Sequence, residues 1–417
     1  MAAEVEADVL ERFLRYVRID TQSDPESTSY PSTAKQRDLG DLLERELREL
    51  GLDDARINEH GYVFARLPGS AGPTIGLIAH MDTSPDESGA GVAPQIVRGY
   101  DGGDIELSPD GRQAIRPTES TLLAARVGHD IVTTDGTTLL GADDKAGIAE
   151  IMAAVAYLVR HPEVEHAPLS IGFTVDEEVG RGVERFDIAA FGADFAYTLD
   201  GAEVGKIDDE TFSASEVRLC IRGHSVHPGT SKGKLVNSIK LAARLLERLP
   251  RDRLSPETTE EREGFVHPTR ISGGAAETLI TFIVRDFDLD ELRGHERLLR
   301  DLAAELEREE PRARVEVTVE DSYRNMKEYL GARPRILEAA DEATRRLGLE
   351  PTRGAIRGGT DGAVLSARGL PTPNLFTGGQ EYHSVREWIS VQDMATAAAL
   401  VVELAKLWAE PEWREGA

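Results

Sequence analysis

Short apolar runs typical of β-strands alternate with amphipathic segments along the first half of the chain. Strand-like runs occur in four places, at 62–67, 74–80, 169–175 and 194–199. A segment with apolar residues at helical spacing, 34–50, precedes them, and a second, 145–161, lies between the second and third runs. Strands that alternate with helices favour a mostly parallel sheet with helices on both faces. We therefore expect an α/β fold with a mixed, mostly parallel sheet covered by helices.

The pattern changes between residues 212 and 323. The predicted order here is strand, helix, strand, strand, helix, strand, which is the order of a ferredoxin-like unit. Its helices are expected over 235–249 and 290–309. Because the helix and strand alternation resumes afterwards, we predict that 212–323 is an inserted domain. The first domain is then discontinuous, with the parts 1–211 and 324–417.

The composition narrows the classes of function. Asp and Glu number 75 against 48 Lys and Arg, which gives a net charge of −27. This excess of acid argues against nucleic acid and against an anionic membrane surface as partners, because both need basic patches. With Cys220 as the one cysteine, the chain can form no intrachain disulfide and no thiolate-based zinc site. No apolar run approaches the roughly 20 residues that span a bilayer, so we expect a cytoplasmic protein.

Histidine and carboxylate side chains gather at the ends of the predicted strands. His80 ends one strand, Asp200 ends another, and His383 follows a Gly-rich turn near the C-terminus. In open α/β sheets the ligand crevice lies at the carboxyl ends of strands. Side chains two apart on an extended segment point the same way, so Asp82 can hydrogen-bond the far ring nitrogen of His80. Taken alone, His80 is also consistent with an ordinary surface histidine.

Two acidic runs point to chemistry as well. Asp143 and Asp144 precede a predicted helix, where a single Asp would suffice as a cap. Asp176, Glu177 and Glu178 follow a strand directly. Because neighbouring side chains project in different directions, one carboxylate can bind a cation while the next faces a water molecule. A helix cap and a solvated acidic turn are the simpler alternatives.

The candidate ligands together suit a catalytic metal centre. Nitrogen and oxygen donors with several carboxylates favour Zn²⁺, Co²⁺ or Mn²⁺ in a catalytic site. Five ligands are too many for one open zinc site, but they fit two metal ions if one carboxylate bridges. The five are His80, Asp143, Glu178, Asp200 and His383.

These motifs resemble those of the M20 metallopeptidases, and within that family the tripeptide aminopeptidases. The matching strings run in order from residue 79 to residue 384. They are AHMDTSPD, TTDGTTLLGADDKAGIAEI, FTVDEEVGRG, YTLDG, VHPGTSKGKLVNS, RDFD, RGGTDGA, PNLFTGG and YHS. The resemblance implies a zinc-peptidase-like catalytic domain, and it implies that the inserted domain is a lid.

The resemblance also implies which metal each ligand serves. His80 and Asp200 would be the terminal ligands of one Zn²⁺, and Glu178 and His383 those of a second. Asp143 would bridge the two ions. Two Zn²⁺ per subunit are therefore expected, with Co²⁺ or Mn²⁺ as substitutes.

Further residues receive roles from the same resemblance. Glu177 would be the general base that deprotonates the bridging water, and Asp82 would orient His80. His227 in the inserted domain would polarise the scissile carbonyl or stabilise its oxyanion, in its own subunit or in a partner's. The alternative for His227 is a turn residue before Pro228.

Two arginines are candidates to grip the terminal carboxylate of a substrate. Arg285 and Arg357 can match a carboxylate bidentately. For either arginine, an internal ion pair with a nearby acid such as Asp286 or Asp361 is the alternative.

The implied activity is release of the N-terminal amino acid from a tripeptide by water that two metal ions activate. Another M20 activity is the nearest alternative: dipeptidase, carboxypeptidase or N-acyl-amino-acid deacylase. A metal-retaining binding protein without catalysis is a third, and the intact Glu177 argues against it. The expected partner is a short peptide substrate, and the outer strand of the lid could pair with a second copy to form a homodimer.

Overall fold

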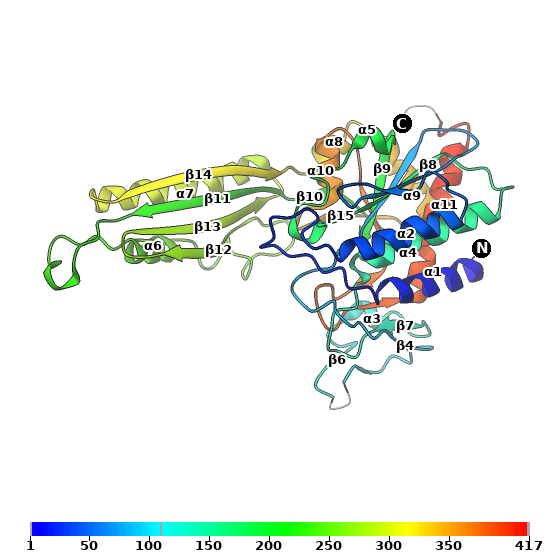
Figure 1. The fold of residues 1–417 in the computed structure, drawn as a ribbon, viewed down its shortest axis with the longest axis horizontal. Helices are drawn as coiled ribbons and strands as arrows, with labels where there is room; N and C mark the ends of the chain where they lie inside the picture. Colours follow the sequence, from blue (N-terminus) through cyan, green and yellow to red (C-terminus); the bar gives the residue numbers. More distant parts are fainter. Residues whose placement is uncertain (1, 109–110, 415–417) are drawn as a thin grey trace. The chain divides into compact units, whose positions relative to one another are not determined.

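The computed structural model describes residues 2–108 and 111–414 (Figure 1). The chain divides into two compact units. The first comprises Met1–Asp209, Met326–Gly354 and Thr360–Ala417, and the second comprises Glu210–Asn325 and Ala355–Gly359. The sequence predicts boundaries after residues 211 and 323, with the short segment 355–359 in the first unit.

The first unit is built around an eight-stranded sheet with the strand order β1-β2-β8-β3-β9-β16-β10-β15. Its four central strands, β8, β3, β9 and β16, run parallel to one another. On the flanks, β2 pairs antiparallel with β8, and β10 pairs antiparallel with β16. The expected mixed, mostly parallel sheet is thus confirmed. The strand bounds are Arg56–Ile57 (β1), Val63–Leu67 (β2), Ile75–His80 (β3), Leu169–Thr174 (β8), Phe195–Gly201 (β9), Lys206–Thr211 (β10), Thr352–Ile356 (β15) and Asn374–Phe376 (β16).

Long helices pack against this sheet and against one another. Helix α4 (Ala142–Arg160) lies against β3 and β9, and it contacts α1 (Ala2–Tyr16) and α11 (Val391–Ala409). Because α4 and α11 are covered on several sides, they are apolar nearly all round. In the described part of the chain, however, no helix is both long and apolar enough to cross a membrane.

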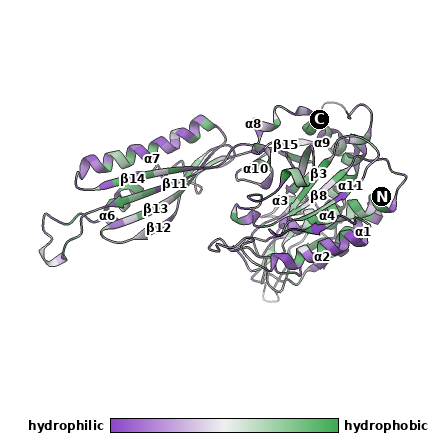
Figure 2. Ribbon diagram, turned by 45° about the horizontal axis from the view of Figure 1, so that its top comes forward, coloured by the Kyte–Doolittle hydropathy of each residue, from purple (hydrophilic) through white to green (hydrophobic). Residues whose placement is uncertain are grey.

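The other helices of the first unit are amphipathic or short. Helix α2 (Gln36–Glu49) contacts β1 and β2 and carries a hydrophilic outer face (Figure 2). Helix α9 (Pro334–Arg346) packs on α11. The short helices are α3 (Thr121–Ala124), α5 (Ile188–Phe191), α8 (Lys327–Leu330) and α10 (Asp361–Ala367).

A second, smaller sheet of the first unit was not predicted from the sequence. Its strand order is β17-β18-β7-β4, and a separate two-stranded ribbon pairs β5 with β6. These strands have only two or three residues each, too few for a periodic pattern to be visible. In the small sheet, β18 pairs antiparallel with β7, and this pairing fixes the chain near residue 388. The bounds are Gln95–Val97 (β4), Ile105–Glu106 (β5), Ala114–Ile115 (β6), Ile131–Thr133 (β7), Gly379–Gln380 (β17) and Trp388–Ser390 (β18).

The second unit has the expected β-α-β-β-α-β order. Its antiparallel sheet has the strand order β12-β13-β11-β14, and α6 and α7 share a core with it. Along β11, Val217, Leu219 and Ile221 are buried, and the residues between them lie on the other face. The bounds are Ser213–Arg222 (β11), Ser238–Glu247 (α6), Phe265–Gly273 (β12), Glu277–Asp286 (β13), Leu289–Glu309 (α7) and Arg314–Tyr323 (β14).

Candidate metal centre

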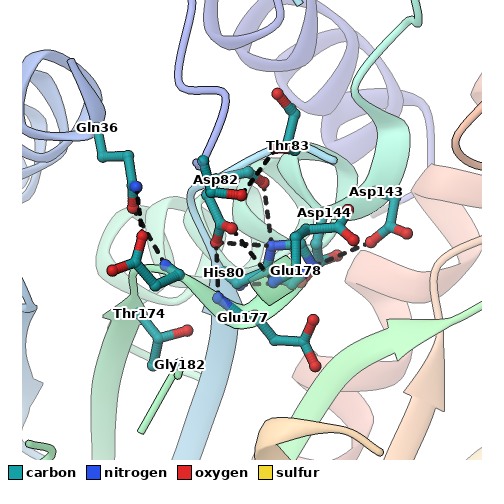
Figure 3. Close-up of polar contacts among 12 residues, drawn as sticks. Gln36, His80, Asp82, Thr83, Asp143, Asp144, Thr174, Glu177, Glu178 and Gly182 are labelled. Atoms are coloured by element: carbon teal, nitrogen blue, oxygen red, sulfur yellow. Dashed lines mark hydrogen bonds and ion pairs between the residues drawn. The ribbon is translucent and has the colours of Figure 1, made fainter. Parts of the chain in front are cut away.

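His80 is the last residue of β3, and its two ring nitrogens face different groups (Figure 3). Its Nε2 lies 3.0 Å from Oδ1 of Asp143 and 3.8 Å from Oδ1 of Asp200. Its Nδ1 lies 3.0 Å from the carbonyl oxygen of Asp82 and 3.4 Å from Oδ1 of the same residue. A carbonyl oxygen can only accept a hydrogen bond, so Nδ1 carries a proton. A metal ion at the cluster would take the place of a proton on Nε2.

Asp143 presents one carboxylate oxygen to each of two imidazoles. Its Oδ1 faces Nε2 of His80, and its Oδ2 lies 3.2 Å from Nε2 of His383. The peptide bond between Asp143 and Asp144 is cis. The carboxylate of Asp144 turns to the backbone instead, because it accepts hydrogen bonds from the N–H of His80 at 3.1 Å and of Gly147 at 3.3 Å. Asp143 therefore has the geometry of a bridging ligand.

Glu178 and His383 form the other side of the cluster. Nε2 of His383 lies 2.9 Å from Oε2 of Glu178, and its Nδ1 lies 3.4 Å from Oδ2 of Asp86. The side chain of Glu178 is 4% exposed, and among the described residues its Oε1 has no hydrogen-bond partner. A buried carboxylate oxygen without a partner is costly unless a cation binds it.

Asp82 links the two sides through the turn that follows β8. Its Oδ1 accepts a hydrogen bond from the backbone N–H of Glu177 at 3.0 Å, and its Oδ2 accepts one from that of Glu178 at 3.2 Å (Figure 3). The same carboxylate lies beside Nδ1 of His80. Asp82 is fully buried, so one fixed side chain orients three residues of the cluster.

Burial and mutual repulsion shift the charges of the cluster. Burial raises the pKa of both Glu177 and Asp200 well above the usual carboxyl range, and it raises the pKa of Glu178 to about 7. Burial also opposes ionisation of Asp143, but hydrogen bonds from His383 and His80 outweigh it and lower the pKa of Asp143. Hydrogen bonds to Asp143 and Glu178 raise the pKa of His383 to about 11. The cluster is thus short of positive charge.

The donor set fits divalent metal ions. Donor atoms of His80, Asp143 and Glu178 lie within 4.8 Å of one another, and so do those of His80, Asp144 and Asp200. The structure therefore brings all five sequence-predicted ligands together and adds Asp144 to the cluster. Nitrogen and oxygen donors of this kind suit Zn²⁺, Co²⁺ or Mn²⁺. A divalent cation would replace the protons that the crowded carboxylates otherwise retain.

Asp176 supports the cluster, a role that the sequence does not predict. It has a left-handed backbone (φ 56°) at the start of the turn that carries Glu177. Its carboxylate accepts hydrogen bonds from the backbone N–H of Ser32 at 2.6 Å and from Nε2 of Gln36 at 2.7 Å. Its own N–H donates to Oε1 of Gln36 at 3.1 Å. These partners are distant in sequence, so no local motif could have revealed them.

His227 belongs to the second unit and is exposed. It precedes a single 3₁₀ turn, Pro228–Thr230, and its Nδ1 accepts a hydrogen bond from the N–H of Gly229 at 3.1 Å. The ring proton therefore belongs on Nε2. In this position the imidazole can offer an N–H group to an anionic oxygen.

Arg285 and Arg357, also of the second unit, differ in what their guanidinium groups already bind. Arg285 donates one long hydrogen bond, 3.4 Å, to the carbonyl oxygen of Arg357, and its Nε is buried without a partner among the described residues. Its guanidinium carbon lies 5.9 and 6.0 Å from the ring centroids of Phe265 and Tyr323. Within the described ranges no carboxylate pairs with Arg285. Neither Asp286 nor Asp361, the partners considered from the sequence, forms that pair.

The guanidinium of Arg357 is occupied by a loop. Its Nη1 donates to the carbonyl oxygens of Glu261 and Glu263, at 2.8 and 2.9 Å. Its Nη2 donates to Oγ1 of Thr259 at 3.0 Å. Arg357 therefore holds a loop of the second unit, whereas the guanidinium of Arg285 makes one long hydrogen bond within the described ranges.

Comparison with known proteins adds independent evidence. A family model described as peptidase family M20/M25/M40 matches residues 133–407. The chain is 47% identical over 404 residues to a Peptidase T of Geobacillus thermodenitrificans, a match that covers 96% of this chain and 98% of that protein. Two crystal structures share its fold with a TM-score of 0.74 at 24% identity: an aminopeptidase PepT from Bacillus cereus and a tripeptidase from Staphylococcus aureus. Each covers 97% of this chain, and the matches span 99% and 98% of the two structures.

Proposed function

The chain belongs to peptidase family M20/M25/M40, and from this membership we propose that it is a metallo-aminopeptidase that releases the N-terminal amino acid from tripeptides. The likeness to a Peptidase T over nearly the whole length supports this activity, and so does the fold shared with a tripeptidase. One observation carries the chemistry: the two oxygens of Asp143 each face a different imidazole, those of His80 and His383.

The proposed centre holds two Zn²⁺ per subunit, with Co²⁺ or Mn²⁺ as substitutes. His80 and Asp200 would hold one ion, Glu178 and His383 would hold the other, and Asp143 would serve both. When bound, two such cations lower the pKa of a water molecule and polarise a carbonyl group. The unpartnered Oε1 of Glu178 and the absence of a thiol from the donor set support this assignment.

Glu177 acts as the general base in this proposal. Figure 3 shows the side chains of Glu177 and Glu178 leaving the turn in different directions, so one can bind a cation while the other meets the water. The hydrogen bond to Asp82 fixes the backbone of Glu177. Burial raises the pKa of Glu177 well above its usual range. Its carboxyl group can therefore hold the proton taken from water until the leaving amine accepts it.

His227 and Arg285 bind the substrate. The Nε2–H of His227 donates to the developing oxyanion, in its own subunit or in a partner's, because Nδ1 is already an acceptor. Arg285 binds the terminal carboxylate of the peptide, because its guanidinium makes one long hydrogen bond and its Nε has no partner among the described residues. Arg357 accepts a hydrogen bond from Arg285 at its carbonyl oxygen, and its guanidinium holds the loop that contains Glu261 and Glu263. We therefore propose that Arg285 binds the substrate and Arg357 supports the loop, in place of two equivalent substrate-binding arginines.

The proposal extends to the setting in which the enzyme works. We place it in the cytoplasm, which agrees with Cys220 as a free thiol. We also propose a homodimer that pairs through the edge strand β12, where Ile271 is 54% exposed. Sedimentation of the protein as a monomer at micromolar concentration would contradict the dimer.

A peptide panel tests the activity. We expect metal-loaded protein to cleave tripeptides, with weak turnover of dipeptides, tetrapeptides and N-acetylated tripeptides, and to release the first amino acid. Strong turnover of acetylated peptides would favour a deacylase instead, and release of the last residue would favour a carboxypeptidase. Glu177→Gln, measured at equal metal content, should lose about 100- to 10,000-fold in kcat. Unchanged turnover would contradict the assignment of the base.

A further inference from the structure

Glu387 is a buried carboxylate that the proposed mechanism does not use. It lies directly before β18 and is 1% exposed. Its Oε2 accepts hydrogen bonds from the backbone N–H groups of Leu140 and Gly141, each at 2.7 Å. Its Oε1 accepts one from the N–H of Asp143 at 3.0 Å. Three backbone donors from one short stretch thus converge on a single side chain.

These donors lie in the stretch that leads into α4, where Asp143 and Asp144 have non-helical backbone angles. The first N–H groups of a helix have no partner within the helix, and a side chain at the preceding residue usually supplies one. Here that residue is Gly141, which has a left-handed backbone (φ 82°) and no side chain. Glu387, from a distant part of the chain, accepts from the N–H of this residue, of Leu140 before it and of Asp143 after it.

Glu387 is itself firmly held, on the turn that carries His383. Its backbone N–H donates to the carbonyl oxygen of Ser384 at 3.1 Å, and its carbonyl oxygen accepts from Oγ1 of Thr133 at 3.2 Å. The strand pairing of β18 with β7 continues this attachment. The same short turn therefore supports His383 and reaches across to the backbone of Asp143.

We propose that Glu387 is a positioning residue for Asp143. It holds the bridging carboxylate so that its Oδ2 faces Nε2 of His383. This inference rests on the proposed two-metal function. Without the carboxylate of Glu387, the backbone N–H groups of Leu140, Gly141 and Asp143 lose these hydrogen bonds, and the two oxygens of Asp143 no longer face both Nε2 atoms together. Groups that orient metal ligands from behind typically contribute about 10- to 100-fold in metal affinity.

Calorimetric titration of the metal-free, full-length protein with Co²⁺ tests this inference. The variants are Glu387→Gln, which removes the charge, and Glu387→Asp, which keeps the charge on a shorter side chain. Glu46→Gln is the matched control, because Glu46 is also buried and accepts hydrogen bonds, from Arg12 and Arg15 on α1. Melting of each metal-free variant shows whether it folds, and Glu387→Asp carries the test if Glu387→Gln does not.

We expect wild type and Glu46→Gln to bind two Co²⁺. In both Glu387 variants, the site with the lower Co²⁺ affinity should bind at least about 10-fold less tightly than in wild type. In an Asp143→Ala background the effect of Glu387→Gln should vanish, because the residue acts through Asp143. Wild-type affinity in Glu387→Gln, or a full effect that persists without Asp143, would overturn the inference while leaving the proposed function intact. A wild-type protein that binds fewer than two ions would overturn the proposed function, and this inference with it.

Discussion

The two sides of the metal centre are held in place by different means. On one side, His80 ends a central strand, is 3% exposed, and has its Nδ1 beside the fully buried Asp82. On the other, His383 has a left-handed backbone, is 39% exposed, and has its Nδ1 beside Asp86, which is 68% exposed. The sheet therefore preorganises the first side, whereas the second depends on a loop. We expect the two metal ions to bind with unequal affinity.

Removing either histidine should show this inequality most strongly. His80 contacts Asp143, Asp200 and Asp82, so His80→Ala should disturb both ions and leave less than one metal equivalent per chain. His383→Ala should keep one equivalent, on the buried side. Elemental analysis after gel filtration measures both. Equal metal contents in the two variants would contradict the asymmetry.

Neutralising the carboxylate behind each histidine should have a smaller effect. Asp82→Asn disturbs the hydrogen bonds to the backbone of Glu177 and Glu178 as well as the contact with His80, so kcat/KM should fall about 100-fold. Asp86→Asn changes one exposed ion pair and should cost less than about fivefold. The two variants serve as controls for one another. A larger loss in Asp86→Asn would reverse the comparison.

The charge of the His383 imidazole, on the exposed side, should affect how the stability of the metal-free protein depends on pH. Hydrogen bonds to Asp143 and Glu178 raise the pKa of His383 to about 11, against an unfolded value of about 6.5. A raised imidazole pKa adds stability that is complete below about pH 6.5 and is lost as the pH rises through about 11. The difference in Tm between wild type and His383→Gln should therefore shrink between pH 6 and pH 10. A constant difference would argue against the charged imidazole.

The smallest effect on activity is expected from a substitution of Glu150, a fully buried residue of α4. Both of its carboxylate oxygens lack hydrogen-bond partners among the described residues, and burial raises its pKa well above the usual range. Because the unfolded carboxyl ionises near pH 4.3, the stability cost of this group grows above that pH, by up to about 1.4 kcal/mol per pH unit. Glu150→Gln should raise the free energy of unfolding more at pH 8 than at pH 5, with activity unchanged. Urea unfolding at the two pH values measures this.

Residues that end a strand could be recognised from the sequence, whereas those that act across the fold could not. His80, Asp200 and Glu178 follow apolar runs, so their meeting at one edge of the sheet follows from the topology of parallel strands. The supports Asp176 and Glu387 contact backbone and side chains far away in sequence, and no local pattern predicts these partners. The small sheet that contains β18 could not be predicted for a different reason, because its strands are too short to show a period.

The inserted unit illustrates the same limit with its arginines. Its β-α-β-β-α-β order was visible because each element is long and periodic. Arg285 and Arg357, in contrast, were equivalent candidates in the sequence. Only the hydrogen bonds of Arg357 to the carbonyl oxygens of Glu261 and Glu263 distinguish them. Pattern thus predicts which residue types gather at a place, but the partners of each side chain depend on packing.

Anomalous X-ray diffraction from crystals of the zinc-loaded protein tests the central claim most directly. The account predicts two zinc peaks, one on each side of Asp143, with His80 and Asp200 at the first and Glu178 and His383 at the second. The peak beside His80 should have the higher occupancy when zinc is limiting. A single peak, or two peaks that share Asp144 in place of Asp143, would contradict the account.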